Sequence, residues 1–491
     1  MEKSIKTGPI GPTLVRLSLP VLAGQAFNLL YNIVDTWFIA RIDPSDPWLV
    51  GATGLVFPVF FLFLAMSFGI SGGVSSLVAR AIGADRSHEL DRTVESGIFL
   101  AIAAGAITLA AIYPVASPLL ALFGGTGLIL DYGLEYLFWL LPVVPFLFLS
   151  AVFIGILQGE GRAQHIMVGM MLGTVANIVL DPVLIFGAGM GIAGAGLATA
   201  AGNAITFIYL LIVFLTRKSR VAVHWKASNV SFPVIGEILR VGIPQSLMNF
   251  LASVSFIFYN RIMIAINPMI LTAFTLYSRL EQFALIPIWS LMSGLSAVAG
   301  QAAGARDFPR LRRASRTASR MAMAVNGSLL VVFALSSPFL FRQFQSDARV
   351  LDLAGIIVPW MAIATFLTVP IFIITTIMSA AGFANRSLAL TAVRIYGFNV
   401  PACAVSAYVF RGNILAVMQA IPVASALSLV LAHAVQRNFF RGLESGKLAV
   451  RFSAKASADQ AASEQAAAAQ GAAAQTADAG QANAGQTEAG R

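Results

Sequence analysis

The chain has 491 residues, of which 58% are hydrophobic and only 11% are charged. Soluble globular proteins carry roughly 25% charged residues, so this composition excludes that class. The formal net charge of +10 would suggest a nucleic-acid partner in a soluble protein. In a membrane protein it indicates instead that lysine and arginine are retained on the cytoplasmic side, and we expect no nucleic acid. The single cysteine, Cys403, excludes an internal disulfide and a cysteine-based metal site.

Apolar stretches of about 20 residues, each long enough to cross a bilayer as a helix, recur along the whole chain. Runs such as 56–64 do not alternate between apolar and polar residues, which argues against a transmembrane barrel. We therefore predict an all-α polytopic membrane protein with twelve transmembrane helices in two pseudo-symmetric six-helix bundles around a central cavity. The predicted spans are 14–40, 50–79, 94–116, 130–157, 163–186, 192–215, 234–266, 270–300, 312–338, 350–380, 386–409 and 414–437.

Arginine and lysine are concentrated in alternate connections between these spans, and few lie in the others. This asymmetry predicts a multi-pass protein of the inner or plasma membrane with both termini in the cytoplasm. The first span, 14–40, is too long for a cleavable signal peptide. The inner connections contain Arg80, Arg86, Arg92, Arg162, Arg217, Lys218, Arg220, Lys226, Arg306, Arg310, Arg312, Arg313, Arg386, Arg437, Arg441 and Lys447.

The two halves of the chain resemble each other at a spacing of about 220 residues. Pro20 corresponds to Pro244, and similar glycine turns follow the second and eighth spans. Each half has an even number of spans, so the repeat is parallel, with its axis along the membrane normal. We predict an N-terminal six-helix bundle at 1–215, a cytoplasmic linker at 216–233, a C-terminal six-helix bundle at 234–440 and a cytoplasmic tail at 441–491, disordered from about 454.

One apolar run, 177–186, carries an acid at membrane depth. Asp181 lies four residues after Asn177, so the two share a helix face, and Pro182 strips the carbonyl one turn back of its donor. A carboxylate in a bilayer is costly, roughly 2.5–3.5 kcal/mol on insertion scales. The stretch is thus a candidate cradle for a proton, a metal cation or a cationic substrate.

Asp35, in the first span, lies at a similar depth, and we predict that it faces the same pocket as Asp181 and shares a proton with it. Two adjacent carboxylates cannot easily both ionise. The alternative is that these polar groups only hydrogen-bond helices together. Polar residues that could support the pocket are Asn28, Asn32, Thr199 and Asn203.

Glu281 is the remaining acid deep in a span, and it belongs to the second half of the chain. It suits recognition of a cationic substrate in the central cavity. The alternative, which the sequence leaves open, is that Glu281 is a buried partner for an arginine such as Arg261.

Two small-residue stretches resemble enzyme or nucleotide motifs but are explained better by packing. Gly69-Ile70-Ser71-Gly72 is similar to the serine motif of intramembrane proteases, yet all four histidines fall near cytoplasmic helix ends. The glycines at 187–196 follow a membrane helix rather than a strand, so we expect a tight turn there. We therefore predict that the protein is not an enzyme.

The chain resembles the multidrug and toxic compound extrusion (MATE) transporters over roughly residues 10–440. The resemblance rests on Pro20, Asn32 and Asp35 in the first span, on 79–84 and 157–161, and above all on 177–186 followed by 194–199. It implies that Asp35, Asn177, Asp181 and Thr199 form a proton- or Na⁺-binding cluster. An acid that some members carry in the seventh span is absent here, where the polar residues are Asn249, Tyr259, Asn260 and Arg261.

The resemblance implies a secondary antiporter that exports cationic or amphiphilic organic compounds in exchange for H⁺ or Na⁺, and the choice of ion stays open. Small-molecule substrates and membrane lipids are the expected partners, a monomer is expected, and no cofactor is expected beyond the coupling ion. The nearest alternative is a flippase for lipid-linked precursors, which would favour an arginine-rich cavity. A scaffold or receptor that transports nothing is a further alternative.

Overall fold

The computed structural model describes residues 5–43, 46, 48–221, 223, 229–344, 347–410 and 413–450. The predicted disorder of the tail from about 454 lies outside these residues. Twelve helices in the described part are long and apolar enough to cross a membrane, in agreement with the predicted spans. The structure therefore confirms an all-α polytopic fold.

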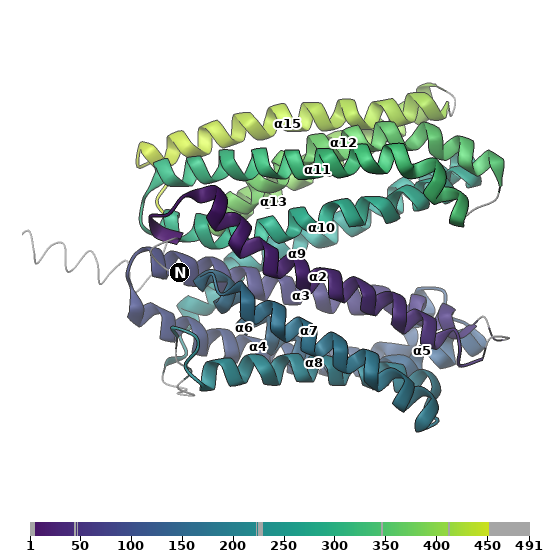
Figure 1. Cartoon of the computed structure of the whole chain (residues 1–491), viewed down its shortest axis with the longest axis horizontal. Coiled ribbons are helices and arrows are strands. Elements are labelled where there is room, and N and C mark those ends of the chain that lie inside the picture. The colour runs from purple at the N-terminus through teal and green to yellow at the C-terminus, as the bar shows by residue number, and fades with distance from the viewer. Residues whose placement is uncertain are drawn as a thin grey trace, which may run out of the picture. The chain divides into compact units, whose positions relative to one another are not determined.

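The first half of the chain forms a bundle, called here the first bundle. The helices α3 and α6 pack against each other, and α7 packs between α2 and α8 (Figure 1). Its elements are α2 (Ile10–Ile39), α3 (Trp48–Gly83), α4 (Ser87–Leu122), α5 (Gly127–Leu140), α6 (Val143–Glu160), α7 (Ala163–Pro182), the π-helix η1 (Val183–Gly187) and α8 (Gly191–Leu215).

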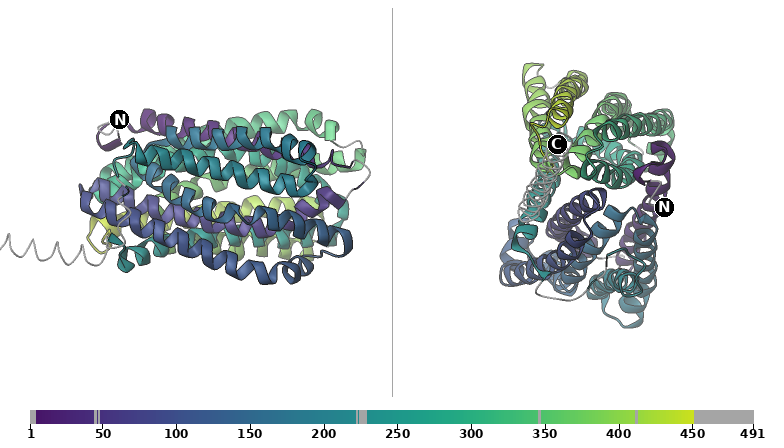
Figure 2. Two further views of the ribbon diagram at one scale, coloured as in Figure 1. Left: turned by 90° about the horizontal axis from the view of Figure 1, so that it is seen from below. Right: turned by 90° about the vertical axis from the view of Figure 1, so that its left-hand side faces the viewer.

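The second half forms the second bundle, in which α12 packs against α10, α11 and α15. Figure 2 shows the helices of both bundles running in nearly the same direction. Its elements are α9 (Phe232–Ile266), α10 (Pro268–Gly304), α11 (Phe308–Phe344), α12 (Ala348–Ala380), α13 (Ala384–Ala392), the π-helix η3 (Val393–Asn399), α14 (Val400–Val409) and α15 (Ile414–Glu444).

Three predicted spans depart from a single continuous α-helix in the structure. The predicted span 130–157 is divided into α5 and α6, because Pro142 has no N–H to continue the helical hydrogen bonds. The predicted span 386–409 contains η3, and the predicted span 163–186 ends in η1 directly after Pro182. The fifth and eleventh spans thus each contain a π-helical segment, at the end of the fifth and in the middle of the eleventh.

The turns that end corresponding helices have the same backbone geometry in both bundles. Gly161 and Gly382 both adopt positive φ, at 77° and 89°, after α6 and α12. Asp85 and Arg306 do the same after α3 and α10, with φ of 56° and 55°. A side chain at such φ values is strained, so the recurrence reflects a common fold in the two halves.

The bundles contact each other at the end of the molecule where α3 and α10 finish, called here the arginine-rich end. A Cβ on Gly83 would lie 2.0 Å from the carbonyl oxygen of Gln301. A Cβ on Gly304 would lie 2.1 Å from that of Arg80. The two contacts are related by the internal repeat, and only glycine permits such close approach of the backbones.

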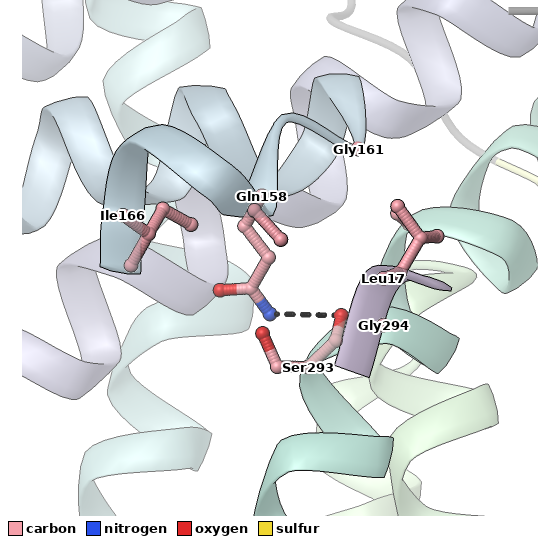
Figure 3. Close-up of a pocket in the computed structure, with 8 residues that line it drawn as sticks. Leu17, Gln158, Gly161, Ile166, Ser293 and Gly294 are labelled. Atoms are coloured by element: carbon pink, nitrogen blue, oxygen red, sulfur yellow. Dashed lines mark hydrogen bonds between the residues drawn. The ribbon is translucent and has the colours of Figure 1, made fainter. Parts of the chain in front are cut away.

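Hydrogen bonds between the bundles cluster in the same region. The Ser76 hydroxyl donates to the carbonyl of Ala380 at 2.9 Å, and Gln301 Nε2 donates to that of Gly159 at 3.0 Å. Gln158 Nε2 donates to the Ser293 carbonyl at 3.4 Å across a small pocket between α2, α6 and α10 (Figure 3). The bundles are therefore closed against each other at the arginine-rich end.

The start of the connection between the bundles is held to the first bundle by the Glu160 carboxylate. Glu160 Oε1 accepts hydrogen bonds from the Ser219 hydroxyl at 2.7 Å and from the Arg220 N–H at 3.0 Å. Glu160 Oε2 lies 3.1 Å from Nε of Arg162. The described start of the predicted linker 216–233 is thus attached to the end of α6.

Candidate functional site

The last turn of α7 carries the deepest acid of the first bundle. Asn177 and Asp181 lie on the buried face of α7, and their exposed fractions are 3% and 0%. Pro182 ends the α-helix, and η1 continues the chain with wider turns, in which the Ala188 N–H donates to the Val183 carbonyl at 2.8 Å. Such π-helical turns are frequent at functional sites.

Helix α8 approaches α7 closely because both have glycines in the contact. A Cβ on Gly202 would lie 2.8 Å from the carbonyl oxygen of Gly173 and 3.0 Å from Cβ of Asn177. This approach brings Thr199, which is 4% exposed, within reach of α7. Asn177 Nδ2 donates to the Thr199 hydroxyl at 3.4 Å.

Asp35, four residues before the end of α2, lies on the other side of α7 from α8. Its carboxylate is close enough to that of Asp181 for the two to interact electrostatically. Tyr136, from α5, interacts with both carboxylates and shares a hydrogen bond with the Thr199 side chain. The structure thus brings Asp35, Asn177, Asp181 and Thr199 together around one further residue, Tyr136.

Several oxygens of this cluster are buried and uncommitted. Within the described residues, both carboxylate oxygens of Asp181, Oδ1 of Asp35 and Oδ1 of Asn177 make no hydrogen bond. A buried polar atom without a partner costs about 1–3 kcal/mol. Folding therefore maintains a costly arrangement whose oxygens can receive a proton or a small cation.

The chemistry of the donors suits hard cations. Carboxylate, amide and hydroxyl oxygens are the ligands that such ions prefer. The described residues contain no group of three or more histidine, cysteine, aspartate or glutamate side chains that could hold a metal ion. A sodium ion would thus require the neutral oxygens of Asn177 and Thr199 as well as the two acids.

The supporting amides are less closely associated with the acids. Asn203 Nδ2 donates to the Thr199 carbonyl of its own helix at 2.9 Å, and Asn28 is exposed. The side chain of Asn32 lies outside the described part of the structure. The structure therefore connects Asn203 to the cluster only through Thr199.

Glu281, on α10, belongs to a separate polar cluster in the second bundle. Its Oε1 accepts hydrogen bonds from the hydroxyls of Tyr277, at 3.4 Å, and Thr365. The tyrosine and threonine hydroxyls are 2.8 Å apart. Arg394, from η3, is the arginine that interacts with this carboxylate, whereas Arg261 is exposed. The arginine partner considered in the sequence analysis therefore comes from the eleventh span and not from the seventh.

Sequence reasoning missed Tyr136 and Arg394. Tyr136 was overlooked because an aromatic residue in a membrane span has a ready explanation in packing. A helical-wheel comparison would have identified it, because Tyr136 lies on the buried face of α5 with Gly133, Leu137 and Leu140.

The interpretation of the small-residue stretches as packing surfaces is confirmed. Gly69 and Gly73 of α3 lie against the backbone of α9, where added Cβ atoms would approach the carbonyl oxygens of Gly242 and Ile238 to 2.6 and 2.3 Å. Gly189 and Gly191 adopt positive φ in the turn between η1 and α8. Neither stretch forms a catalytic or phosphate-binding arrangement among the described residues.

Comparison with known proteins places this geometry in context. The family model described as MatE matches residues 20–183 and 244–405. Curated relatives include the multidrug export protein MepA of Staphylococcus aureus, 26% identical over 288 residues, or 58% of this chain and 63% of MepA. MepA of Staphylococcus haemolyticus is 28% identical over 57% of this chain and 62% of its own length. The match therefore spans less than two thirds of these relatives.

Solved structures are matched over nearly their whole length. One is the outward-facing conformation of a multidrug resistance MATE family transporter of the MOP superfamily, with a TM-score of 0.84 and 26% identity over 90% of this chain and 98% of that one. Another is a MOP superfamily transporter from Pyrococcus furiosus, with a TM-score of 0.82 at the same identity and coverage. The two-bundle fold described above is thus shared with solved transporters.

Proposed function

The chain belongs to the MatE family, and from this premise we propose that it is a secondary antiporter that exports cationic or amphiphilic organic compounds in exchange for H⁺ or Na⁺. The observation that carries the proposal is the buried, uncommitted Asp181 carboxylate beside Asp35 in the first bundle. Ionisable groups inside membrane spans are rare and typically mark ion pathways.

The proposed orientation places the arginine-rich end in the cytoplasm, as the distribution of arginine and lysine favours. The bundles are closed against each other at that end, which supports our proposal that the described state is outward-open. The similarity to an outward-facing MATE transporter supports this assignment. In this state, ions from outside reach the cluster, because Asp35 and Asp181 lie near the ends of α2 and α7 that point away from the arginine-rich end.

The proposed transport cycle follows from charge. With both carboxylates ionised, the cluster carries two negative charges in a region of low dielectric. Uptake of a proton or Na⁺ removes part of this repulsion and changes the hydrogen bonding among α2, α5, α7 and α8. A bound ion that lowers substrate affinity must itself be bound less tightly when substrate is present, because coupling between two sites is reciprocal. Ion binding from outside thus promotes substrate release to the outside.

Glu281 is the proposed contact for the cationic part of the substrate in the second bundle. Arg394 compensates the charge of Glu281 in the absence of substrate, which lowers the cost of burying the carboxylate. A cationic substrate would compete with Arg394 for this carboxylate. We propose no cofactor beyond the coupling ion, and a monomer as the transporting unit.

The test is efflux from proteoliposomes with separately imposed proton and sodium gradients. We expect wild-type protein to transport ethidium when one gradient is imposed, and the Asp35→Asn and Asp181→Asn variants to lose that dependence. Variants that insert normally and still transport ethidium at wild-type rates would overturn the proposal.

A flippase for lipid-linked precursors is a second candidate, and Arg394 is the observation that favours it. An arginine inside a span can bind a phosphate, but here it interacts with Glu281, which offsets its charge. Binding of a lipid pyrophosphate to wild-type protein, together with its loss in Arg394→Gln, would favour the flippase.

A further inference from the structure

The first half of α11 carries exposed arginines along one side of the helix. Arg313, Arg316 and Arg320 are exposed, and their spacing of three and four residues places them on one face. Helix α11 contains no aspartate or glutamate over its whole length. This face is therefore strongly positive at the arginine-rich end.

Helix α15 packs beside α11 at the same end and contributes further basic residues. Gln436 Nε2 donates to the Ser315 hydroxyl at 2.8 Å, and Arg312 lies over the Phe440 ring at 5.2 Å from its centre. These contacts place the two helices side by side, and the surface that their exposed sides form is called here the α11–α15 groove. Its exposed basic side chains are Arg313, Arg316 and Arg320 of α11 with His433, Arg437 and Arg441 of α15.

Only one acid of these two helices neutralises the groove. Glu444, at the end of α15, pairs with Arg312 at 3.0 Å. No other aspartate or glutamate occurs in α11 or α15. The positive charge of the groove thus exceeds what its own acid can compensate.

The position of the groove along the membrane normal follows from the uncharged segments next to its basic residues. Residues 321–341 carry no charged side chain and lie between Arg320 and Arg342. At about 1.5 Å per residue this segment matches the roughly 30 Å of a bilayer's hydrocarbon core. Residues 414–432 are likewise uncharged and end at His433. Arg320 and His433 therefore mark the boundary between acyl chains and headgroups, and the remaining basic residues lie at phosphate level.

Comparison with the first half of the internal repeat shows that membrane topology does not by itself explain these arginines. Helix α4 is the first-bundle counterpart of α11 and also begins at the arginine-rich end. Counted 221 residues earlier, Arg313 corresponds to Arg92, whereas Arg316 and Arg320 correspond to Glu95 and Phe99. The first bundle thus begins at the same end without a cation at two of these three positions, so a topology signal does not account for Arg316 and Arg320.

The surface beyond the groove is apolar. Toward the middle of the membrane the same sides of the two helices expose Val331 and Leu335 on α11 and Val423 and Val430 on α15, with exposed fractions of 59–80%. A soluble polyanion would match only the basic residues. A lipid matches both the basic residues and the apolar surface.

We propose that the α11–α15 groove binds an anionic phospholipid of the cytoplasmic leaflet, with its phosphate among Arg316, Arg320 and Arg437 and its acyl chains along the apolar side chains beyond them. Basic pockets between transmembrane helices on the cytoplasmic side bind acidic headgroups in this way. The inference depends on the proposed orientation only for the name of the leaflet.

The test is native mass spectrometry of the purified full-length protein with phosphatidylglycerol or phosphatidylcholine added after delipidation. We expect wild-type protein to retain phosphatidylglycerol about tenfold more than phosphatidylcholine, since several arginines contribute to the attraction. The double variant Arg316→Gln/Arg437→Gln should lose most of this preference. A matched control, Arg217→Gln/Lys218→Gln, removes the same charge from the exposed end of α8 and should keep it.

Equal retention of the two lipids by wild-type protein would overturn the proposal. So would a preference that is lost as much in the control as in the groove variant, or displacement of the lipid by inorganic phosphate alone. Lipid retention is measured without transport, so a failure of the antiporter proposal would not produce any of these results.

Discussion

The two bundles share a backbone but differ at the positions where the first one places its acids. About 220 residues after Asp35 and Asp181, the second bundle has Tyr259 and Cys403. Tyr259 lies near Cys403 and Asn399, and it is also within electrostatic range of Arg394 and Glu281. The fold therefore supplies a polar site in both halves, and among these equivalent positions only the first bundle carries acids.

The second bundle carries its acid on α10 beside this site and compensates its charge. Glu281 receives hydrogen bonds from Tyr277 and Thr365 and interacts with Arg394, whereas both oxygens of Asp181 are uncommitted. A compensated acid is suited to charge recognition, and an uncommitted one to binding and releasing a coupling ion. The predictions that follow test this division of roles.

Neutralising the acids of the first bundle should have the largest effect. We expect Asp181→Asn to reduce gradient-driven efflux roughly 5- to 150-fold, the usual range of coupling between two sites. The matched control is Cys403→Ser at the equivalent position, which should transport nearly as wild type. Ethidium efflux from proteoliposomes measures both, and an equal loss in the two variants would contradict the division.

Adding a side chain at the close backbone contacts of the arginine-rich end should have the second-largest effect. A Cβ at Gly304 would approach the Arg80 carbonyl oxygen to 2.1 Å, so Gly304→Ala should destabilise the closed contact by about 1–3 kcal/mol, as overpacking does. The variant should populate the alternative conformation, which distance measurements between spin labels on α3 and α10 can detect. Gly236→Ala, where a Cβ meets nothing within 4 Å, is the control, and a similar shift there would refute the assignment.

Removing the charge of Glu281 should affect stability more than ion coupling. Glu281→Gln leaves Arg394 without its acid, which we expect to cost about 1–3 kcal/mol, less than for a fully buried pair because Glu281 is only half-buried. The double variant Glu281→Gln/Arg394→Gln should recover part of this loss in a thermal unfolding assay. Additive losses in the double variant would show that the two charges do not interact.

Removing the Tyr136 hydroxyl should have the smallest effect. Tyr136→Phe deletes its hydrogen bond to Thr199, a contribution of about 0.5–1.5 kcal/mol, which corresponds to a roughly 2- to 10-fold change in the apparent affinity for the coupling ion. The maximal efflux rate should change little. Efflux measured as a function of ion concentration separates the two quantities, with Tyr259→Phe as the equivalent variant in the second bundle.

Much of this fold could be predicted from the sequence because membranes impose a simple rule on helices. The spans followed from apolar length, and the acids Asp35 and Asp181 were conspicuous because charge is rare in such segments. The sequence predicts only that Pro182 leaves the carbonyl one turn back without its donor. It does not predict the π-helix that follows, because helix propensity does not specify which wider turn replaces a lost hydrogen bond.

The rest depended on contacts between segments that are distant in the sequence. Tyr136 approaches Asp35 and Asp181 only because α5 packs on α8, where a Cβ on Gly196 would lie 2.9 Å from the Tyr136 carbonyl oxygen. The approach of Arg394 to Glu281 similarly depends on how the helices of the second bundle are arranged. Sequence periodicity gives the buried face of each helix but not the neighbour that the face meets.

The most direct test of the central claim is the release of coupling ion when substrate binds to the solubilised protein. Ethidium is added either to protein in weakly buffered, sodium-free solution, where proton release is measured, or to protein loaded with radioactive sodium. It should displace protons or Na⁺ from wild-type protein and from the Tyr259→Phe/Cys403→Ser variant. Asp35→Asn/Asp181→Asn should bind ethidium without releasing either ion. Undiminished ion release from this variant would contradict the assignment of coupling to the first bundle.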